Sequence, residues 1–378
     1  MNILFKINDL ELLLNRYPKS NDKNLQAWDS SDQYLLEYFK QHIEQSSTSQ
    51  DPKTILIIND TFGTLACGLS HHKLFWQSDS FISHQACKTN LEDNQLTSQI
   101  TFLDSLDALS DAPDVILLKL PKSNAMLKHQ LQQIASIADQ DTLIISTAKA
   151  KDIHSSTLSL FEHHIGTTTT SLAKKKSRLI FSQKEKTLQA AEPKVVQWPL
   201  AEYDFTIHNY AGVFANNQLD IGARLMLENI PEQLGDVFVI DLGCGNGVLG
   251  LAVAAKNPLA TVRFTDESAM AIASAKLNCE QNIPQSEVEF DWNDCLSGYD
   301  YDQADLIVCN PPFHQLKTVT DHIAWQMFND AYRTLKRGGK LRIVGNRHLG
   351  YHIKLQRLFG NCITVAANNK FVILEATK

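Results

Sequence analysis

Residues 237–252 form the segment that most constrains the fold of this chain. The segment opens with Val237-Phe-Val-Ile240, a short apolar run with β-branched residues that predicts a buried strand. Three glycines at alternate positions follow, Gly243, Gly245 and Gly247, and lead into an apolar run with helical spacing. A strand that turns through glycines into a helix brings bare backbone and helix amides close to a ligand at the edge of an open α/β sheet. We therefore expect an α/β fold with a ligand site at this turn.

Asp241 stands at the end of the predicted strand, shortly before the glycines. A dinucleotide site has to hold a pyrophosphate and has little use for a carboxylate at this place. S-adenosylmethionine carries an ammonium and a sulfonium and no phosphate, so a carboxylate suits it. We therefore expect Asp241, Gly243, Gly245 and Gly247 to bind S-adenosylmethionine. A tight strand-to-helix turn with Asp241 as a capping residue is the structural alternative.

The composition limits the class of protein. With 378 residues the chain has room for about two domains. Its seven cysteines are scattered and include no C-x-x-C pair, which favours a reducing cytoplasm. The histidines show no metal-binding spacing, no apolar run approaches the roughly 20 residues that span a bilayer, and the first residues do not resemble a signal peptide. We expect a cytoplasmic protein with no metal and no membrane partner. The net charge of -7 counts against a nucleic-acid partner without excluding one.

Four stretches of the first half match four stretches of the second half in the same order, which indicates an internal duplication. The paired ranges are 54–69 with 237–251, 78–90 with 265–278, 114–122 with 305–313, and 143–146 with 341–344. In this alignment Thr61 and Phe62 stand where Gly243 and Cys244 stand, so the first copy has lost the bare backbone of the glycine turn. We expect the first copy to keep the fold and to lack the cofactor site.

The domain boundaries follow from this duplication. The first copy carries Lys119-Leu-Pro-Lys122 where the second carries Asn310-Pro-Pro-Phe313. We expect residues 1–182 to form the degenerate domain, the polar residues 183–196 to form a linker, and residues 197–378 to form the catalytic domain.

A domain that keeps its core but loses its site has usually taken another task. We hypothesise that the first domain binds and positions RNA, with Lys119 and Lys122 at the surface that meets the substrate. A pure scaffold is the alternative. Residues 1–50, which begin this domain, contain apolar clusters that favour helices packed on it.

Two further carboxylates follow the next strands of the second copy. Asp266 follows the predicted strand 261–265 and lies 25 residues after Asp241 (266 − 241), a spacing that suits a carboxylate binding ribose hydroxyls. Asp294 ends the next predicted strand, 288–294, and can accept from the exocyclic amine of adenine. We expect both to bind the cofactor. An ordinary loop position is the alternative for Asp294.

The segment Asn310-Pro311-Pro312-Phe313 is the most specific chemical signal in the chain. Prolines have no amide hydrogen and stiffen the loop, so the Asn310 side-chain oxygen and the Pro311 carbonyl are acceptors without neighbouring donors. Both can accept from one NH2 group, while Phe313 supplies a stacking face. Such a site suits methyl transfer to the weakly nucleophilic nitrogen of a planar substrate, because fixed acceptors let its lone pair turn toward the methyl donor. A plain Asn-Pro turn is the structural alternative.

With these residues the chain resembles class I S-adenosylmethionine-dependent methyltransferases, and more narrowly the bacterial rRNA guanine-N2 methyltransferases of the RsmC/RlmG family. The matching signatures are Gly212-Val-Phe214, Leu219-Asp-Ile-Gly222, Asp241-Leu-Gly-Cys-Gly-Asn-Gly247 and Asn310-Pro-Pro-Phe-His314. The resemblance implies an α/β fold of two tandem class I, Rossmann-like methyltransferase domains, the N-terminal one degenerate. The likeness is strongest to the branch of the family that methylates a guanine of 23S rRNA.

The resemblance also implies roles for single residues. Asp241 and the glycines would hold the methionine part of the cofactor, Asp266 the ribose and Asp294 the adenine edge, while Asn310 to Phe313 would grip guanine N2. The implied partner is 23S rRNA, free or in a large-subunit precursor, and the oligomeric state stays open. Two alternatives remain: an N-methyltransferase acting on another rRNA guanine, an adenine or a protein glutamine, and a non-enzymatic RNA-binding ribosome-assembly factor.

A basic stretch follows the catalytic motif in sequence. Residues 333–342 are rich in Lys and Arg and lead into a predicted strand, after which Arg347 and His348 follow. We expect this basic stretch, together with Arg347 and His348, to face RNA phosphates. A solvated helix end is the alternative.

Overall fold

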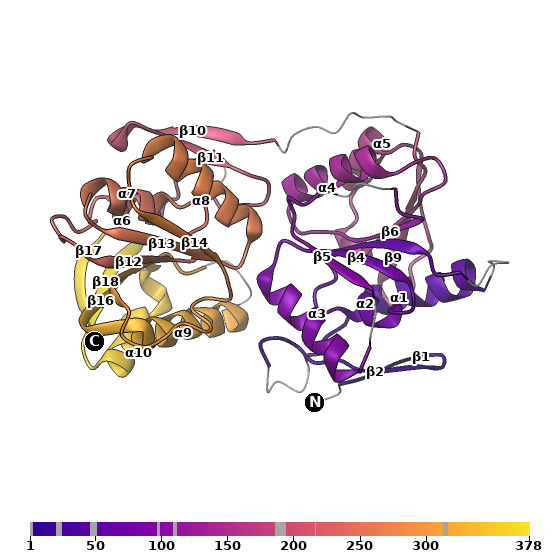
Figure 1. The fold of residues 1–378 in the computed structure, drawn as a ribbon, viewed down its shortest axis with the longest axis horizontal. Helices are drawn as coiled ribbons and strands as arrows, with labels where there is room; N and C mark the ends of the chain where they lie inside the picture. The colour runs from indigo at the N-terminus through magenta and orange to yellow at the C-terminus, as the bar shows by residue number, and fades with distance from the viewer. Residues whose placement is uncertain are drawn as a thin grey trace. The chain divides into compact units, whose positions relative to one another are not determined.

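The computed structural model describes residues 3–19, 25–45, 51–96, 99–108, 112–185, 194–215, 217–312 and 317–378. The chain divides into two compact units, Met1–Lys194 and Val195–Lys378. Each unit contains a seven-stranded sheet with helices on both faces, together with a two-stranded hairpin (Figure 1). The fold expected from the sequence, two tandem α/β domains, is confirmed.

The second unit is an open, mostly parallel sheet. Its strands are β10 (Val196–Leu200), β11 (Phe205–Asn209), β12 (Phe238–Leu242), β13 (Thr261–Asp266), β14 (Val288–Trp292), β15 (Ala304–Cys309), β16 (Leu335–Asn346), β17 (Ile363–Ala367) and β18 (Phe371–Thr377). Its helices are α6 (Ile221–Leu227), α7 (Val248–Lys256), α8 (Ala269–Asn282), α9 (Lys317–Thr334) and α10 (Tyr351–Phe359), with short 3-10 turns η3 (Ala201–Tyr203) and η4 (Arg347–Leu349). The strand order is β14-β13-β12-β15-β16-β18-β17, in which β18 runs antiparallel to both neighbours.

The first unit has the same topology. Its strands are β1 (Leu4–Ile7), β2 (Leu10–Leu13), β3 (Thr54–Ile58), β4 (Lys73–Gln77), β5 (Ile100–Leu103), β6 (Val115–Lys119), β7 (Leu143–Lys149), β8 (Thr168–Thr170) and β9 (Ser177–Ser182). Its helices are α1 (Ser30–Phe39), α2 (Thr64–Gly68), α3 (Phe81–Asp93), α4 (Asn124–Ile137) and α5 (Ser155–His164), with the π-helix η1 (Lys40–Glu44) and the 3-10 turn η2 (Ala150–Asp152). The strand order β5-β4-β3-β6-β7-β9-β8 matches the second unit strand for strand, which confirms the duplication.

The central strands explain why the sheets were visible in the sequence. In the second unit, Val239, Leu306 and Val308 join the apolar cluster on the face covered by α6, α7 and α8, whereas Ile240 and Ile307 join the cluster on the face of α9 and α10. Strands that are buried on both faces read as continuous apolar runs. Among the described residues, no helix is both long and apolar enough to cross a bilayer.

The expectation that residues 1–50 are helical is wrong in part. β1 and β2 form an antiparallel hairpin, and helix begins only at α1 within the described residues of this segment. Phe5, Ile7, Leu12 and Leu14 are buried at every second position, which is the period of a strand. The three consecutive leucines at positions 12–14 hide this alternation in the sequence.

In the second unit, two asparagines of α8 tie the hairpin to the rest of the unit. Asn278 accepts from the His208 amide at 2.7 Å and donates to the carbonyls of His208 and Asn246, at 2.8 and 2.9 Å. Asn282 accepts from the Thr206 amide at 2.9 Å and donates to the Thr206 carbonyl at 3.0 Å. Because Asn246 lies in the glycine turn, one side chain joins the hairpin to the turn.

The first unit repeats this arrangement. Asn90 of α3 accepts from the Asn15 amide and donates to the carbonyls of Asn15 and Phe62. The Asn94 side chain, just after the same helix, accepts from the Leu13 amide and donates to the Leu13 carbonyl. The duplication therefore includes the hairpins, which the sequence alignment did not detect.

The sheet registers correct the alignment of the glycine turn. Ile58 of β3 lies opposite Leu118 of β6, and Leu242 of β12 lies opposite Cys309 of β15. Since the matched stretches 114–122 and 305–313 make Leu118 equivalent to Cys309, Ile58 is equivalent to Leu242.

The residues that follow confirm this register. Gly63 and Gly247 each lie five residues further on, and each precedes a helix with a positive φ, 77° and 81°. Counting back from these glycines, Asn59 occupies the place of Gly243. The expectation that Thr61 is equivalent to Gly243 is wrong by two positions. Phe62 is likewise not equivalent to Cys244, whose place Asp60 occupies.

We call the contacts of Asn278 with the hairpin and the glycine turn the asparagine bridge. The Asn278→Ala variant tests its role. The change removes three hydrogen bonds made by a fully buried side chain and leaves buried backbone groups without partners. We expect the free energy of unfolding, measured with urea, to fall by about 3 kcal/mol. Asn282→Ala is the matched control, and we expect a loss of about 1 kcal/mol because its side chain is half-buried. Equal losses in the two variants would contradict this reading.

Candidate active site

Asp241 lies beneath the glycine turn. It belongs to β12, and its side chain is 1% exposed. Its Oδ2 accepts a hydrogen bond of 2.8 Å from the amide of Gly250 in the first turn of α7. Burial raises the pKa of Asp241 to about 7, although this hydrogen bond lowers it. No Lys or Arg among the described residues offsets the charge, so a cationic group near the turn would stabilise the ionised carboxylate.

The three glycines have different surroundings. A Cβ on Gly245 would meet no atom within 4 Å, so the turn presents bare backbone to open space there. A Cβ on Gly247 would lie 2.9 Å from the Cβ of Ala275 and 3.2 Å from the ring of Phe264. Gly243 has one close neighbour, the Met327 methyl group, at 2.8 Å. Gly247 therefore permits tight packing of the turn, while Gly245 leaves room for a ligand.

Asp266 and Asp294 lie at the ends of the next two strands. Asp266 ends β13 and accepts from the amides of Gly245 and Ser268, both at 2.9 Å. It thereby fixes the glycine turn to the neighbouring strand. Asp294 follows β14, is 3% exposed and accepts from the Gln326 side chain at 2.9 Å. Burial raises the pKa of Asp294 above its usual value.

Asn310 comes directly after β15, at the carboxyl end of that strand. Its Oδ1 is buried and has no hydrogen-bond partner among the described residues. A buried amide oxygen left this way costs about 1–3 kcal/mol, which indicates that a donor is missing. Pro311 is buried and Pro312 is half-buried. Phe313 lies outside the described residues.

The sheet order brings the predicted residues to one edge. β13, β12 and β15 are adjacent and parallel, so Asp266, the glycine turn and Asn310 all lie at their carboxyl ends. Asp294 follows the next strand of the same sheet, β14. This edge is the topological switch point, where open α/β sheets bind ligands. Carboxylates and bare backbone fit a cationic cofactor, and the unpartnered amide oxygen fits the amino group of a planar substrate.

Several residues that support this edge were not expected from the sequence. Asn246 of the glycine turn donates to the side-chain oxygen of Asn209 at 3.0 Å, and Gln326 of α9 holds Asp294. The asparagines spaced four residues apart in both α3 and α8 were a visible signal for the bridging contacts. No pattern in the sequence marks Gln326.

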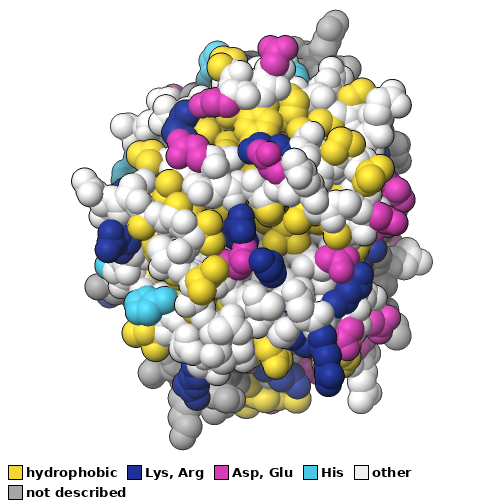
Figure 2. Space-filling view, turned by 90° about the vertical axis from the view of Figure 1, so that its left-hand side faces the viewer, with side chains coloured by type: hydrophobic (Ala, Val, Ile, Leu, Met, Phe, Trp, Pro, Cys, Tyr) yellow, Lys and Arg dark blue, Asp and Glu magenta, His cyan; other side chains and the backbone are white. Residues whose placement is uncertain are grey.

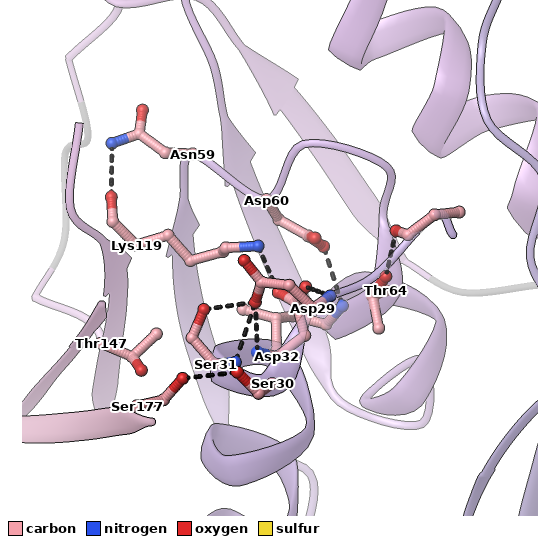
Figure 3. A network of polar contacts seen from close by, with 12 residues as sticks. Asp29, Ser30, Ser31, Asp32, Asn59, Asp60, Thr64, Lys119, Thr147 and Ser177 are labelled. Atoms are coloured by element: carbon pink, nitrogen blue, oxygen red, sulfur yellow. Dashed lines mark hydrogen bonds and ion pairs between the residues drawn. The ribbon is translucent and has the colours of Figure 1, made fainter. Parts of the chain in front are cut away.

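At the matching edge of the first unit, Lys119 occupies the place of Asn310 (Figure 3). Its ammonium group bonds to Asp32 in the first turn of α1, and the charges of Asp29 and Asp60 also stabilise it. The Lys119 side chain is 14% exposed. The expectation that Lys119 lies free at the substrate surface is therefore wrong, because its largely buried ammonium group is ion-paired with Asp32.

The carboxylates around Lys119 also serve the backbone. Asp29 caps α1, and Asp60 Oδ2 accepts from the amides of Leu65 and Ala66 at 2.9 and 3.0 Å. Burial raises the pKa of Asp32 to about 6, although Lys119 lowers it. Burial alone would lower the pKa of Lys119, but the three carboxylates hold it above its usual value. The first unit thus supplies its own cation at this edge.

A separate cluster in the first unit contains Glu44, His71 and His72, whose ligand atoms lie within 4.8 Å of one another. These residues show no metal-binding spacing in the sequence. His72 Nδ1 accepts from the Lys53 amide, so its Nε2 carries the proton and donates to Glu44. Hydrogen bonds from His71 and His72 hold the pKa of Glu44 well below its usual range. With both nitrogens of His72 occupied, hydrogen bonding accounts for the cluster without an ion.

The fold and this edge together define a class I methyltransferase. A family model described as the methyltransferase small domain matches residues 204–375, and one described as the RLMG N-terminal domain matches residues 2–186. The solved structure of the T. thermophilus 16S rRNA N2 methyltransferase RsmC, in complex with AdoMet and guanosine, has the same two-unit fold. The TM-score is 0.76, the match covers 99% of this chain and 97% of that one, and the identity is 18%.

Curated relatives match along their full length. The ribosomal RNA large subunit methyltransferase G of Pseudoalteromonas translucida (strain TAC 125) is 48% identical over 385 residues, covering 100% of this chain and 99% of that protein. The protein of the same name from Klebsiella pneumoniae (strain 342) is 49% identical over 377 residues, covering 99% and 98%. The chain belongs to the ribosomal RNA large subunit methyltransferase G family, so the resemblance found in the sequence is confirmed.

The Lys119→Met variant tests the charge balance of the first unit. At pH 8 it leaves the buried Asp32 and Asp60 and the half-buried Asp29 without a cation, and we expect the amides of β3 and β6 to lose about 3–5 kcal/mol of protection against hydrogen exchange. The pKa of Asp32 is already raised, so at pH 5 this group can bind a proton and the loss should be smaller. The exposed Lys122→Met is the control and should change protection by less than about 0.5 kcal/mol. A loss that is the same at both pH values would contradict this account.

Proposed function

We propose that this protein transfers a methyl group from S-adenosylmethionine to the exocyclic N2 of a guanine in 23S rRNA. The observation that carries the proposal is the buried Oδ1 of Asn310, an acceptor without a donor at the ligand edge of a methyltransferase fold. An exocyclic amino group is the donor that this atom lacks. The names of the relatives, which are large subunit rRNA methyltransferases, support rRNA as the substrate. The guanosine complex of RsmC supports guanine as the base.

The carboxyl edge of the second unit offers a suitable group for the methionine, the ribose and the adenine of the cofactor. S-adenosylmethionine supplies a methyl group bound to a positively charged sulfur. Asp241 and Asp266 place negative charge at the glycine turn, and the open space at Gly245 admits the methionine part and the ribose. Asp294, with one oxygen held by Gln326, accepts from the adenine amine through the other.

Asn310 and its neighbours orient the substrate. Asn310 Oδ1 and the Pro311 carbonyl accept the two hydrogens of the guanine amino group, and Pro312 and Phe313 bound the ring. The fixed acceptors turn the N2 lone pair toward the methyl carbon. The nitrogen–carbon bond forms as the carbon–sulfur bond breaks, and N2 releases one proton to water. Positioning and electrostatic stabilisation supply the rate, so no general base is needed.

The same edge carries cations without carboxylate partners. Most basic side chains of the second unit are neutralised by an acid. These are Arg224, Lys256, Arg263, Arg333, Lys336, Lys340, Arg342 and Lys378. On the face shown in Figure 2, basic and acidic side chains accordingly lie interspersed. Arg347 and Lys370 are exposed, and no carboxylate of the described residues lies within 4 Å of either one.

These two cations are held close to each other at the end of β16. The Arg347 amide donates to the Lys370 carbonyl at 3.0 Å, and the Arg347 guanidinium donates to the Asn368 carbonyl at 3.2 Å. Their position suits contact with the phosphates that flank the target guanine. Such local contacts explain how a chain with a net charge of -7 binds RNA. His348, exposed beside Arg347, can add a donor there.

The proposal also covers the roles of the two domains and the compartment of the reaction. Residues 1–182 belong to the degenerate domain that positions RNA through surfaces other than Lys119, and residues 197–378 belong to the catalytic domain. Of the expected linker, 183–196, Gln183 and Glu185 still hydrogen-bond to the first unit and Val196 begins β10, so the linker is shorter than expected. The reaction takes place in the cytoplasm, as an rRNA substrate requires. The buried core of the first unit and its filled edge support a role that needs no cofactor.

The Asn310→Ala variant tests the catalytic assignment. We expect cofactor affinity to stay within about threefold, while transfer of labelled methyl to 23S rRNA falls roughly 100- to 1,000-fold, because a transition-state contact is lost. Nucleoside analysis of the wild-type product should give N2-methylguanosine. Product identified as N6-methyladenosine or methylglutamine, or no label at all, would reject the proposed function; full turnover by the variant would reject only the role of Asn310.

The double variant Arg347→Gln with Lys370→Gln tests the phosphate contacts. We expect KM for rRNA to rise roughly 10-fold at about 150 mM salt. The slope of log affinity against log salt concentration should become shallower by about one to two, because one to two fewer phosphates are neutralised. The value of kcat and the cofactor affinity should not change. Arg337→Gln with Lys276→Gln removes two exposed cations away from this edge and should have no such effect. A rise in KM that is the same for both pairs would show only general charge attraction.

A further inference from the structure

Asn346 carries a second buried amide oxygen at the carboxyl edge. It is the last residue of β16, its side chain is 6% exposed, and its Oδ1 has no hydrogen-bond partner among the described residues. Burying an amide oxygen without a donor is unfavourable, so its presence needs an explanation. Nothing in the sequence shows that this asparagine is buried, so its position in the chain alone indicates no role.

Asn310 and Asn346 extend two neighbouring strands on the same face of the sheet. β15 and β16 run parallel and pair directly. Val308 and Val344 both belong to the apolar cluster on the face of α6. Side chains two residues further along a strand return to the same face, so Asn310 and Asn346 both point to the side of α6. The register continues with Asn310 opposite Val344, so Asn346 lies two residues further along its strand, roughly 7–8 Å from Asn310 on the diagonal, and both long amide side chains can converge on one base from there.

The surroundings of both residues support this placement. In the first unit, Lys119 at the place of Asn310 reaches the first turn of α1, the helix that corresponds to α6 (Figure 3). Asn346 lies opposite Phe371 of β18, and the Phe371 ring lies 3.1 Å from where a Cβ on Gly222 would stand in the first turn of α6. Asn346 therefore lies near the start of α6, and the contact of Lys119 indicates the same direction for Asn310.

Guanine offers two adjacent donors on the edge that carries N2, the N1–H and the amino group. We propose that Asn346 Oδ1 accepts from guanine N1–H while Asn310 Oδ1 accepts from the amino group, so that Asn346 selects guanine. Adenine presents a lone pair at N1, which an amide oxygen repels, and a buried acceptor that loses its donor penalises the wrong base strongly. This inference rests on the proposed function and names how the same site recognises its base.

An rRNA fragment with 2-aminopurine in place of the target guanine tests this role. This base keeps the amino group at N2 but has an acceptor at N1. We expect the wild-type protein to methylate the guanine fragment roughly 10- to 100-fold more efficiently than the 2-aminopurine fragment. Asn346→Ala should lower kcat/KM for guanine by roughly the same factor and change the value for 2-aminopurine by less than about threefold. The discrimination between the two bases would then be nearly lost.

The outcomes separate this role from a structural one. A structural role would lower activity on both fragments equally, and that result would overturn the inference. Asn361→Ala, which removes a hydrogen-bonding asparagine near Thr377 at the far end of β18, is the matched control and should leave the discrimination unchanged. If Asn346→Ala fails to fold, the wild type still decides: equal methylation of both fragments overturns the inference. Absence of wild-type transfer to the guanine fragment would instead reject the proposed function.

Discussion

A charge buried at the carboxyl edge of a sheet needs a partner, and the two units meet this requirement differently. In the second unit, Asp241 is buried and one helix amide stabilises it, which leaves part of the requirement to a bound cation. In the first unit, Lys119 brings an ammonium group to the matching edge, where Asp32 and two further carboxylates surround it. One topology therefore produces an edge whose cation belongs to the chain and an edge whose cation comes with a ligand.

The asparagine bridges show which contacts belong to the fold and which to the chemistry. Asn278 and Asn90 make the same three hydrogen bonds in the two units, although only the second unit keeps the glycine turn. Each bridge satisfies backbone groups in or just after the second hairpin strand and in the loop that follows the central strand, and buried backbone groups require such partners. Because the first unit retains the bridge without the site, the bridge serves folding. It supports the active edge only by holding the loop in place.

The sequence predicted the sheets, the duplication and the active edge well, for a physical reason in each case. Buried strands appear as apolar runs, and the glycine turn needs residues that no other side chain can replace. Other features depend on burial, which the sequence does not display. Lys119 is expected to meet substrate because it stands in the stretch that replaces Asn310 to Phe313, and only its acidic neighbours allow it to be largely buried. Asn346 was overlooked because most asparagines lie in solvent. The hairpin of β1 and β2 was missed because consecutive leucines conceal a period of two.

The position of one acid explains how the first unit lost its site and kept its fold. Asp241 caps the helix after the turn from within β12, so the turn itself can consist of small residues that leave space for a ligand. In the first unit, the register puts the buried Ile57 at the place of Asp241, and Asp60 caps the matching helix from inside the loop. The capping contact is preserved, but the carboxylate now fills the loop. A lysine at the place of Asn310 then gains a partner instead of a ligand. Each change puts a contact within the chain where the second unit leaves room for a ligand, so the first unit satisfies these groups without one.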